Sequence, residues 1–167
     1  MMQAKDNENI IVDFRFNRGG NYTTVLPLVE TLSNLVPKKG KLYLIVGTNT
    51  FSAGIIASSQ FKYYAPDKLI VVGSEMGDGL RFKAEGFYPE LPYSGIKLYL
   101  TKGWTDLIDK CGMLDNCWLP NKFLLNEIGA LHIDIHAEND WQAILNNKEN
   151  IMDAIALDIN KRNSRHP

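Results

Sequence analysis

The chain has 167 residues, of which 45% are hydrophobic and 22% charged, and its formal net charge is −1. Such a composition is ordinary for one globular domain with a substantial core, and it excludes a disordered or collagen-like chain. Because acids and bases are interspersed without a basic stripe, nucleic acid is not an expected partner, and no apolar run approaches the roughly 20 residues of a membrane span.

The first half of the chain alternates apolar strands with amphipathic helices. Residues 1–9 are too polar for a signal peptide, so no export signal is expected there. Three later runs are largely apolar and rich in β-branched residues, which is typical of strands covered on both faces. In the segments between these strands, apolar residues recur at the spacing of amphipathic helices. The expected strands are residues 10–14, 42–46 and 69–72, and the expected helices are residues 22–37 and 51–64.

This order of elements predicts the fold class: α/β, with a parallel sheet built from βαβ units and flanking helices. The three strands are expected to be parallel neighbours joined by right-handed crossovers. In such a sheet the loops that follow the strands leave the same edge, and open α/β sheets bind their ligands there. The loops that follow the three strands are therefore expected to lie together.

The second half is less regular. Glycine-rich and proline-rich segments separate shorter candidate elements, without an internal repeat or a linker that would mark a second domain. Residues 81–85 and 96–101 are expected to be strands, residues 87–95 irregular, and residues 104–129 mostly loop. Strict alternation over residues 131–136 predicts a strand buried on one face only, and residues 142–159 have the spacing of one or two helices.

Cys111 and Cys117 are the only cysteines, and they lie close together in a loop-like stretch. Two thiols alone cannot form a structural zinc site. In an oxidising compartment they are expected to form a short-range disulfide, and in the cytosol two free thiols. The sequence favours neither state, because it does not identify the compartment. No metal site and no cofactor are predicted.

A small polar segment, residues 49–54 (NTFSAG), lies between the second expected strand and the helix after it. A hydroxyl in the first turn of a helix, just past a strand's carboxyl end, lies where unpaired N–H groups and the helix dipole favour negative charge. An acyl-transfer enzyme needs its nucleophile in such surroundings, and Ser52 is the candidate. The alternative is that Asn49 or Thr50 is only a helix N-cap and Ser52 an ordinary first-turn residue.

Two glycine-rich loops are expected at the same edge of the sheet. Gly19 and Gly20 follow the first strand, and adjacent glycines permit backbone conformations closed to other residues, so their N–H groups can approach a ligand closely. A plain tight turn is the alternative interpretation of this pair. The second loop, residues 74–80 (SEMGDGL), follows the third strand.

Three segments in one order carry a family resemblance: residues 11–20 (IVDFRFNRGG), 49–54 (NTFSAG) and 72–79 (VGSEMGDG). They resemble the signature segments of the tail-specific, or C-terminal processing, serine peptidases, tricorn-like relatives included. That family has an aspartate-arginine strand ending in asparagine and glycines, a threonine-x-serine-alanine turn, and a loop rich in glycine and glutamate. The resemblance covers residues 10–101, and residues 92–95 (PYSG) look like a fourth, weaker segment.

The resemblance implies a ClpP/crotonase-like fold and a serine-type peptidase that acts on a peptide or protein substrate. Ser52 corresponds to the nucleophile, and the oxyanion would be held by the N–H of Ala53 and by an N–H of Gly19 or Gly20. Preorganised donors of this kind stabilise a transition state by several kcal/mol. The family also implies a periplasmic or secreted parent protein, and it leaves an oligomer open.

The chain departs from the family at the general base. Processing proteases activate the serine with a lysine of the glycine-rich loop, where this chain offers Glu75 and Asp78 instead. The nearest lysine, Lys83, is expected to be a solvated strand residue. Tricorn-like relatives use a histidine from a segment before the first signature, whereas His132 and His136 lie far after it and are expected on the open face of a strand.

The missing base leads to an expectation for the whole chain. The chain begins only a few residues before the first signature segment, so we expect residues 1–167 to be a single, N-terminally truncated catalytic domain, the C-terminal part of a longer protease. A serine hydroxyl needs a base within about 3 Å to lose its proton during attack. The chain alone is therefore expected to be a weak peptidase that lacks the preceding segment of its parent.

Two other functions fit the sequence. An α/β-hydrolase-like esterase is suggested by residues 50–54 (TFSAG), which are one residue from the glycine-x-serine-x-glycine elbow. The gap between Val46 and Ser52 is long for such a sharp turn. A non-catalytic binding module of the same fold, for a hydrophobic ligand or a peptide, is suggested by the missing base and by retinoid-binding repeats that are similar to these peptidases.

Overall fold

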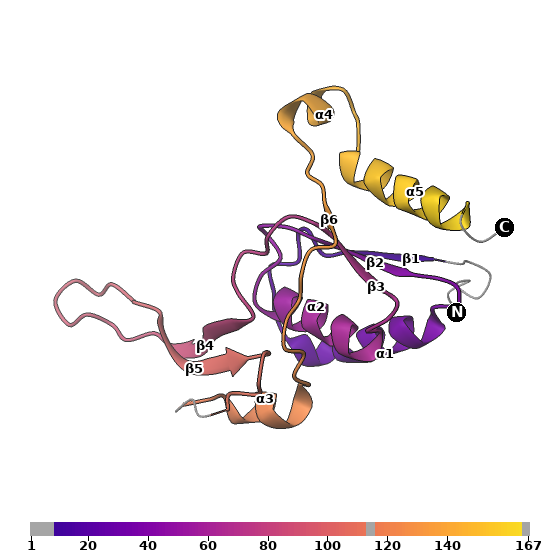
Figure 1. Cartoon of the computed structure of the whole chain (residues 1–167). Coiled ribbons are helices and arrows are strands. Elements are labelled where there is room, and N and C mark those ends of the chain that lie inside the picture. The colour runs from indigo at the N-terminus through magenta and orange to yellow at the C-terminus, as the bar shows by residue number, and fades with distance from the viewer. Residues whose placement is uncertain (1–8, 113–115, 165–167) are drawn as a thin grey trace.

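The computed structural model describes residues 9–112 and 116–164, and its central layer is a parallel sheet of four strands (Figure 1). The strand order is β1-β2-β3-β6. Leu44 of β2 pairs with Val12 of β1 and with Val71 of β3. The α/β class and the parallel neighbours predicted from the sequence are thus confirmed, while the polar opening of the chain before residue 9 lies outside the described residues. The strands are β1 Ile10–Asp13, β2 Leu42–Val46, β3 Leu69–Gly73 and β6 Ile135–His136.

Helices cover both faces of the sheet. The helices α1 (Leu26–Leu35) and α2 (Ala53–Tyr64) pack on one face, and α5 (Asn150–Asn163) packs on the other (Figure 1). A short 3-10 helix, η2 (Tyr22–Thr24), leads into α1. Successive strand residues point to opposite faces, so Leu44 belongs to the apolar cluster under α1 and α2, and Tyr43 to the cluster under α5. Burial on both faces explains the continuous apolar sequence of β2.

The strand β1 was expected to be covered on both faces, and this expectation is wrong. It lies at the edge of the sheet, and Ile11 is 41% exposed. The apolar cluster under α5 draws on β2, β3 and β6, so Ile11 lies outside the area that this helix covers. The strand also ends at Asp13, one residue early, although Phe14 is buried and its N–H still donates to the carbonyl of Ile45.

An antiparallel hairpin of β4 (Arg81–Phe87) and β5 (Leu100–Asp106) extends away from the sheet (Figure 1). The strand expected over residues 81–85 lies within β4. The strand expected over residues 96–101 is wrong, because the ladder of β5 begins only at Leu100. The region 104–129, expected to be mostly loop, contains the end of β5 and the helix α3 (Leu119–Leu124). The bounds of β5 are set by its pairing with β4. The alternation of apolar and polar residues in so short a segment does not predict which residues pair.

The C-terminal region confirms the expected alternation only in part. Of residues 131–136, only Ile135 and His136 pair with β3. The reason lies at Asp134, whose carboxylate accepts a hydrogen bond from the N–H of Val71 at 2.8 Å and so occupies a donor that a ladder would use. A short helix, α4 (Trp141–Leu145), and α5 follow. Within the described residues, no helix combines the length and the hydropathy that crossing a membrane requires.

Cys111 and Cys117 form a disulfide, so the bridged state is the one found of the two that the sequence left open. The bridge closes a short loop between the end of β5 and the start of α3. The N–H of Trp118 donates to the carbonyl of Trp104 at 2.9 Å, and the N–H of Trp104 donates to the carbonyl of Asn116 at 3.0 Å. Together these bonds hold the start of α3 beside the hairpin.

Candidate active site

Ser52 lies between β2 and α2, at the carboxyl edge of the sheet, and its backbone conformation is unusual. Its φ is 51° and its ψ is −117°, a combination that L-residues rarely adopt and that costs on the order of 1–3 kcal/mol. Ser52 occupies the N-cap position of α2, but its side chain makes no capping hydrogen bond. The hydroxyl of Ser52 is therefore not used to start the helix, and neither Asn49 nor Thr50 is its N-cap.

The conformation of the turn before α2 is imposed by hydrogen bonds to the end of β1. Thr50 is fully buried, and its hydroxyl accepts from the N–H of Gly47 at 3.0 Å and donates to the carbonyl of Phe14 at 2.8 Å. The N–H of Phe51 donates to the carbonyl of Asn17 at 2.9 Å. These bonds fix the residues before Ser52, and α2 fixes those after it, which explains why Ser52 stays strained.

Gly19 is in direct contact with this turn. A Cβ added at Gly19 would lie 2.7 Å from the Cβ of Ser52 and 3.2 Å from the amide nitrogen of Ala53, and the φ of Gly19 is 111°. Only glycine fits so close an approach with this backbone. The first glycine loop and the Ser52 turn, which we expected at one edge of the sheet, therefore lie against each other.

The possible oxyanion donors differ in their hydrogen bonds. The N–H of Gly19 donates to the side-chain oxygen of Asn17 at 3.1 Å. Gly20 has a φ of 127° and open space where a side chain would be, and within the described part of the chain its N–H donates to no acceptor. Ala53 is the first residue of α2, so its N–H has no helical carbonyl to bond. Gly20 and Ala53 are thus the donors left open to a ligand.

The loop that follows β3, residues 74–80, is here named the third loop after the third strand, and it is bonded to the same turn. The N–H of Gly77 donates to the carbonyl of Thr50 at 3.0 Å. Glu75 and Asp78 are both exposed, and the carboxylate of Asp78 accepts from the N–H of Gly79 at 2.8 Å. This loop therefore lies beside the Ser52 turn, but Glu75 is exposed to solvent and the Asp78 carboxylate bonds its own backbone.

The other candidate bases lie on different elements. Lys83 is on β4, where its ammonium group is 5.1 Å from the centre of the Trp104 ring, so it takes part in a cation–π contact of the hairpin. His132 is exposed in the segment before β6. His136 is also exposed, but it is paired with Gly73, the residue that precedes the third loop. Of these three side chains, only His136 lies at the carboxyl edge where Ser52 is found.

An ion-pair network lies at the same edge. Arg15 donates to both oxygens of Asp13 and, at 2.7 Å, to the carboxylate of Glu149. Burial alone would raise the pKa of Asp13, but the hydrogen bonds from Arg15 outweigh it and lower that pKa. A cavity of about 510 Å³ opens beside Arg15, and its lining combines polar residues of the edge, such as Asn49 and Ser74, with apolar residues such as Ile144 and Ile151. Arg15 thereby connects the first signature segment to the beginning of α5.

Sequence reasoning missed two residues that build this site. The carbonyl of Asn17 accepts a hydrogen bond from the turn, and its side chain accepts one from Gly19 of the glycine loop. The buried hydroxyl of Thr50 links the segment after β1 to the segment after β2. A polar residue between a buried strand and a pair of glycines is the signal that could have identified Asn17. No group of three or more His, Cys, Asp or Glu side chains could hold a metal ion within residues 9–112 and 116–164.

Comparison of the chain with protein-family models, with curated proteins and with solved structures found no match. The function is therefore inferred from the residues of the chain itself. Three features bear on it: a strained serine at a strand-to-helix turn, a glycine loop in contact with that serine, and a third loop bonded to the same turn.

Proposed function

We propose that the chain is a serine-type peptidase domain of ClpP/crotonase-like fold, similar to the tail-specific peptidases, with Ser52 as its nucleophile. The strained backbone of Ser52 carries the proposal. Proteins retain such strain where a mechanism needs it, because a residue of ordinary conformation would be more stable. Here the strain leaves the Ser52 hydroxyl without a capping bond at a helix N-terminus, where negative charge is favoured.

The reaction would follow the usual course of acyl transfer. The Ser52 oxygen attacks the carbonyl carbon of the peptide bond while a base takes the hydroxyl proton. The carbonyl oxygen then carries the negative charge, which the N–H groups of Ala53 and Gly20 stabilise. Collapse of this intermediate breaks the C–N bond, the leaving amine takes the proton from the base, and water hydrolyses the acyl ester of Ser52 in a second, equivalent cycle.

The general base limits the rate. Glu75 and Asp78 are exposed carboxylates, and a carboxylate is a weak base for a serine hydroxyl. His136 lies at the same edge of the sheet, and an imidazole is the side chain that most often acts as a general base. We therefore expect slow, Ser52-dependent hydrolysis of an unstructured peptide, and we expect His136→Ala to reduce it more than His132→Ala, its matched control.

A non-catalytic binding module is the second candidate. The observation that favours it is that the carboxylates of the third loop are exposed and Lys83 is engaged on the hairpin, so none of these groups is fixed on Ser52. In such a module the strained turn would only shape a binding surface. Covalent labelling separates the two functions, because a fluorophosphonate reacts with an activated serine and leaves an unactivated one untouched.

The test is fluorophosphonate labelling followed by peptide mapping. We expect modification of Ser52 in the native chain, no modification in Ser52→Ala, and unchanged labelling in Ser74→Ala, which removes another hydroxyl at the same edge. Absence of labelling in the folded native chain, together with no peptide hydrolysis above the Ser52→Ala background, would rule out the peptidase and leave the binding module.

A further inference from the structure

The outer part of the hairpin, residues 87–100, is here named the arm; it begins and ends at Phe87 and Leu100, the last pair of the β4–β5 ladder. It projects away from the sheet and the helices (Figure 1). Within the arm, a bridge joins Glu90 to Lys97, and the rings of Tyr88 and Tyr99 pack with centroids 4.9 Å apart. A two-stranded hairpin that packs on nothing else is only marginally stable in water. We therefore expect the arm to be ordered only when it packs against another surface.

The arm exposes many large hydrophobic residues. Eight of them between positions 87 and 100 are each 41–102% exposed, and Tyr93 at the tip is fully exposed. With roughly 200 Å² for a whole aromatic residue, and less for an aliphatic one, these exposed fractions correspond to about 800 Å² of residue surface around the arm, its polar atoms included. About 800 Å² is also what each partner contributes to a stable interface of standard size.

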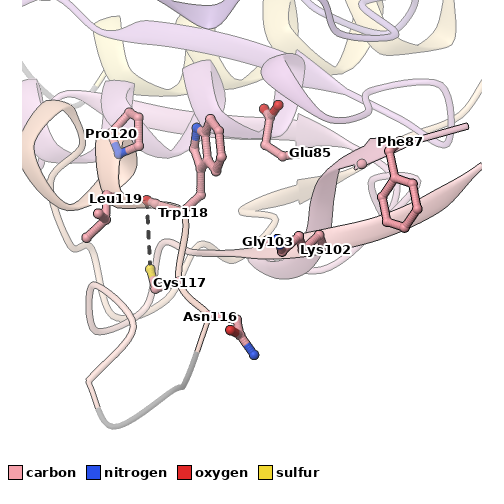
Figure 2. A pocket seen from close by; sticks show the side chains of 10 residues that line it. Glu85, Phe87, Lys102, Gly103, Asn116, Cys117, Trp118, Leu119 and Pro120 are labelled. Atoms are coloured by element: carbon pink, nitrogen blue, oxygen red, sulfur yellow. Dashed lines mark hydrogen bonds between the residues drawn. The ribbon is translucent and has the colours of Figure 1, made fainter.

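An apolar hollow lies at the base of the same hairpin. Its volume is about 710 Å³, and it is lined by Phe87 of β4 and by Trp118, Leu119 and Pro120 before and in α3 (Figure 2). Leu119 is 64% exposed and Trp118 is 40% exposed, so the floor of the hollow is accessible. The chain thus carries a protruding apolar tip and, at the other end of the same arm, an apolar hollow.

We propose that the arm is the self-association element of this protein, and that two copies pair their arms antiparallel about a two-fold axis. In that arrangement the tip of each arm, with Tyr93, packs into the hollow of the other copy. Both contacts can form in one dimer, because antiparallel pairing places the tip of each arm at the base of the other arm. A two-fold interface uses the same patch on both copies, which is the commonest form of soluble oligomer.

The charges of the arm fit a second copy of the chain. Glu90 and Lys97 stand near the tip, while Glu85 and Lys102 line the hollow. The tip and the hollow thus each carry one acid and one base, so neither has a net charge that would repel the other in a second copy. A strongly charged partner would find no opposite net charge here, and the neutral, apolar surface suits a second copy of the chain.

The first test is sedimentation velocity on the full chain over a series of concentrations. We expect a reversible dimer that Tyr93→Glu weakens at least about 30-fold, because the substitution forces a charge into the apolar hollow. Trp141→Glu is the matched control, since Trp141 is 68% exposed on α4, away from the arm. A monomer at every concentration, or a dimer that Trp141→Glu weakens and Tyr93→Glu does not, would overturn the proposal.

A second measurement locates the contact. A photoreactive benzoylphenylalanine replaces Tyr93, and this chain is mixed with a nitrogen-isotope-labelled copy before irradiation. We expect crosslinks between copies that join position 93 to the peptide containing Trp118 and Leu119. Crosslinks confined to one copy, or to another region of the second copy, contradict the antiparallel arrangement. Circular dichroism of each variant verifies that the fold is retained, so loss of the dimer is not loss of structure.

Discussion

The parallel sheet and the arm have similarly apolar sequences but opposite surroundings. In β2 every residue is buried, because α1 and α2 cover one face of the sheet and α5 the other. In the arm, residues such as Ile96 and Tyr99 are more than half exposed, and the antiparallel partner strand contributes hydrogen bonds but no covering layer. An apolar run therefore indicates a need for burial, and only the neighbouring elements decide whether that need is met within the chain.

The largest effect is expected where the sheet is broken. Val71 is 2% exposed in the cluster under α1 and α2, and Val71→Asp would bury an unpaired carboxylate. This costs several kcal/mol against a total stability of about 5–15 kcal/mol, so we expect the domain to be unfolded or close to it. Circular dichroism and urea titration measure the change in free energy of unfolding.

The matched variant of the arm is Ile96→Asp. Because Ile96 is 55% exposed, we expect its effect on the free energy of unfolding of the monomer to stay within about 0.5 kcal/mol. If Ile96→Asp destabilises the monomer as much as Val71→Asp does, the arm is part of the core and the contrast between the two regions is false.

The sequence predicted the sheet well because its strands are local signals. The continuous apolar runs of β2 and β3 require cover on both faces, and parallel pairing follows from the helices between them. The hairpin and β6 were predicted poorly, because their bounds depend on partners that are distant in sequence. The start of β5 depends on pairing with β4, and the length of β6 depends on the Asp134 carboxylate that bonds Val71.

For the candidate site, the sequence predicted the elements and not the conformation. Glycine patterns and the position after a strand indicated that Gly19 and Ser52 share one edge of the sheet. The strained backbone of Ser52 was not predictable, because it results from bonds that join Thr50 to Phe14 and Phe51 to Asn17, which are distant in sequence. The general base was not predicted, because His136 reaches this edge only through the pairing of β6 with β3, which is distant in sequence.

The second prediction concerns the base of the hairpin, which is stabilised by hydrogen bonds to a buried carboxylate, whereas the sheet is stabilised by apolar packing. The side chain of Asp106 is fully buried, and its carboxylate accepts from Arg81 at 2.6 Å and from the N–H of Ile108 at 2.9 Å. Burial alone would raise the pKa of Asp106, but these hydrogen bonds lower it below its ordinary value of 3.8. Asp106→Asn should lower the free energy of unfolding by about 2 kcal/mol at neutral pH.

The pH dependence of this effect has a definite sign. Since the folded-state pKa of Asp106 is below the unfolded-state value, its contribution is fully present above about pH 4 and is lost as the pH falls through the folded-state pKa. Urea unfolding at neutral and at acid pH should therefore show a difference between native chain and Asp106→Asn that shrinks in acid. Asp109→Asn, whose side chain is 56% exposed, is the control and should show little effect at either pH. A difference independent of pH would contradict the ion pair.

The third prediction concerns the attachment of α5 to the sheet. Tyr43 is fully buried in β2, and its hydroxyl donates to the carboxylate of Asp158 on α5 at 2.8 Å. Burial and this bond raise the pKa of Tyr43 to about 12. Tyr43→Phe keeps the packing and removes the bond, so we expect a loss of about 1.5 kcal/mol in the free energy of unfolding at neutral pH.

The alkaline behaviour tests the same bond. Because the folded-state pKa of Tyr43 is raised, its contribution is fully present below about pH 10, the unfolded-state value, and is lost as the pH rises through about 12. Ultraviolet titration of the native chain should show one tyrosine that ionises near pH 12, absent from Tyr43→Phe and retained in Tyr63→Phe, whose ring is exposed. If the signal that Tyr43→Phe removes titrates near pH 10 in the folded chain, α5 does not cover Tyr43.

The smallest effect has the opposite sign and tests the strain at Ser52. Glycine adopts a φ of 51° with a ψ of −117° without steric cost, so Ser52→Gly should release about 1–3 kcal/mol of strain. Glycine also costs about 0.5–1 kcal/mol in backbone entropy, which leaves a net gain near 1 kcal/mol in the free energy of unfolding. Ser52→Ala removes the same hydroxyl but keeps a Cβ and hence the strain, so its stability should not rise.

Urea unfolding of the two variants separates strain from hydroxyl loss, and peptide hydrolysis should be absent in both. If the two variants are equally stable, the turn is not strained, and the main observation behind Ser52 as a nucleophile is lost. If Ser52→Gly is the more stable variant and both are inactive, the native Ser52 lowers the free energy of unfolding while the proposed chemistry depends on it, as expected of a residue retained for function.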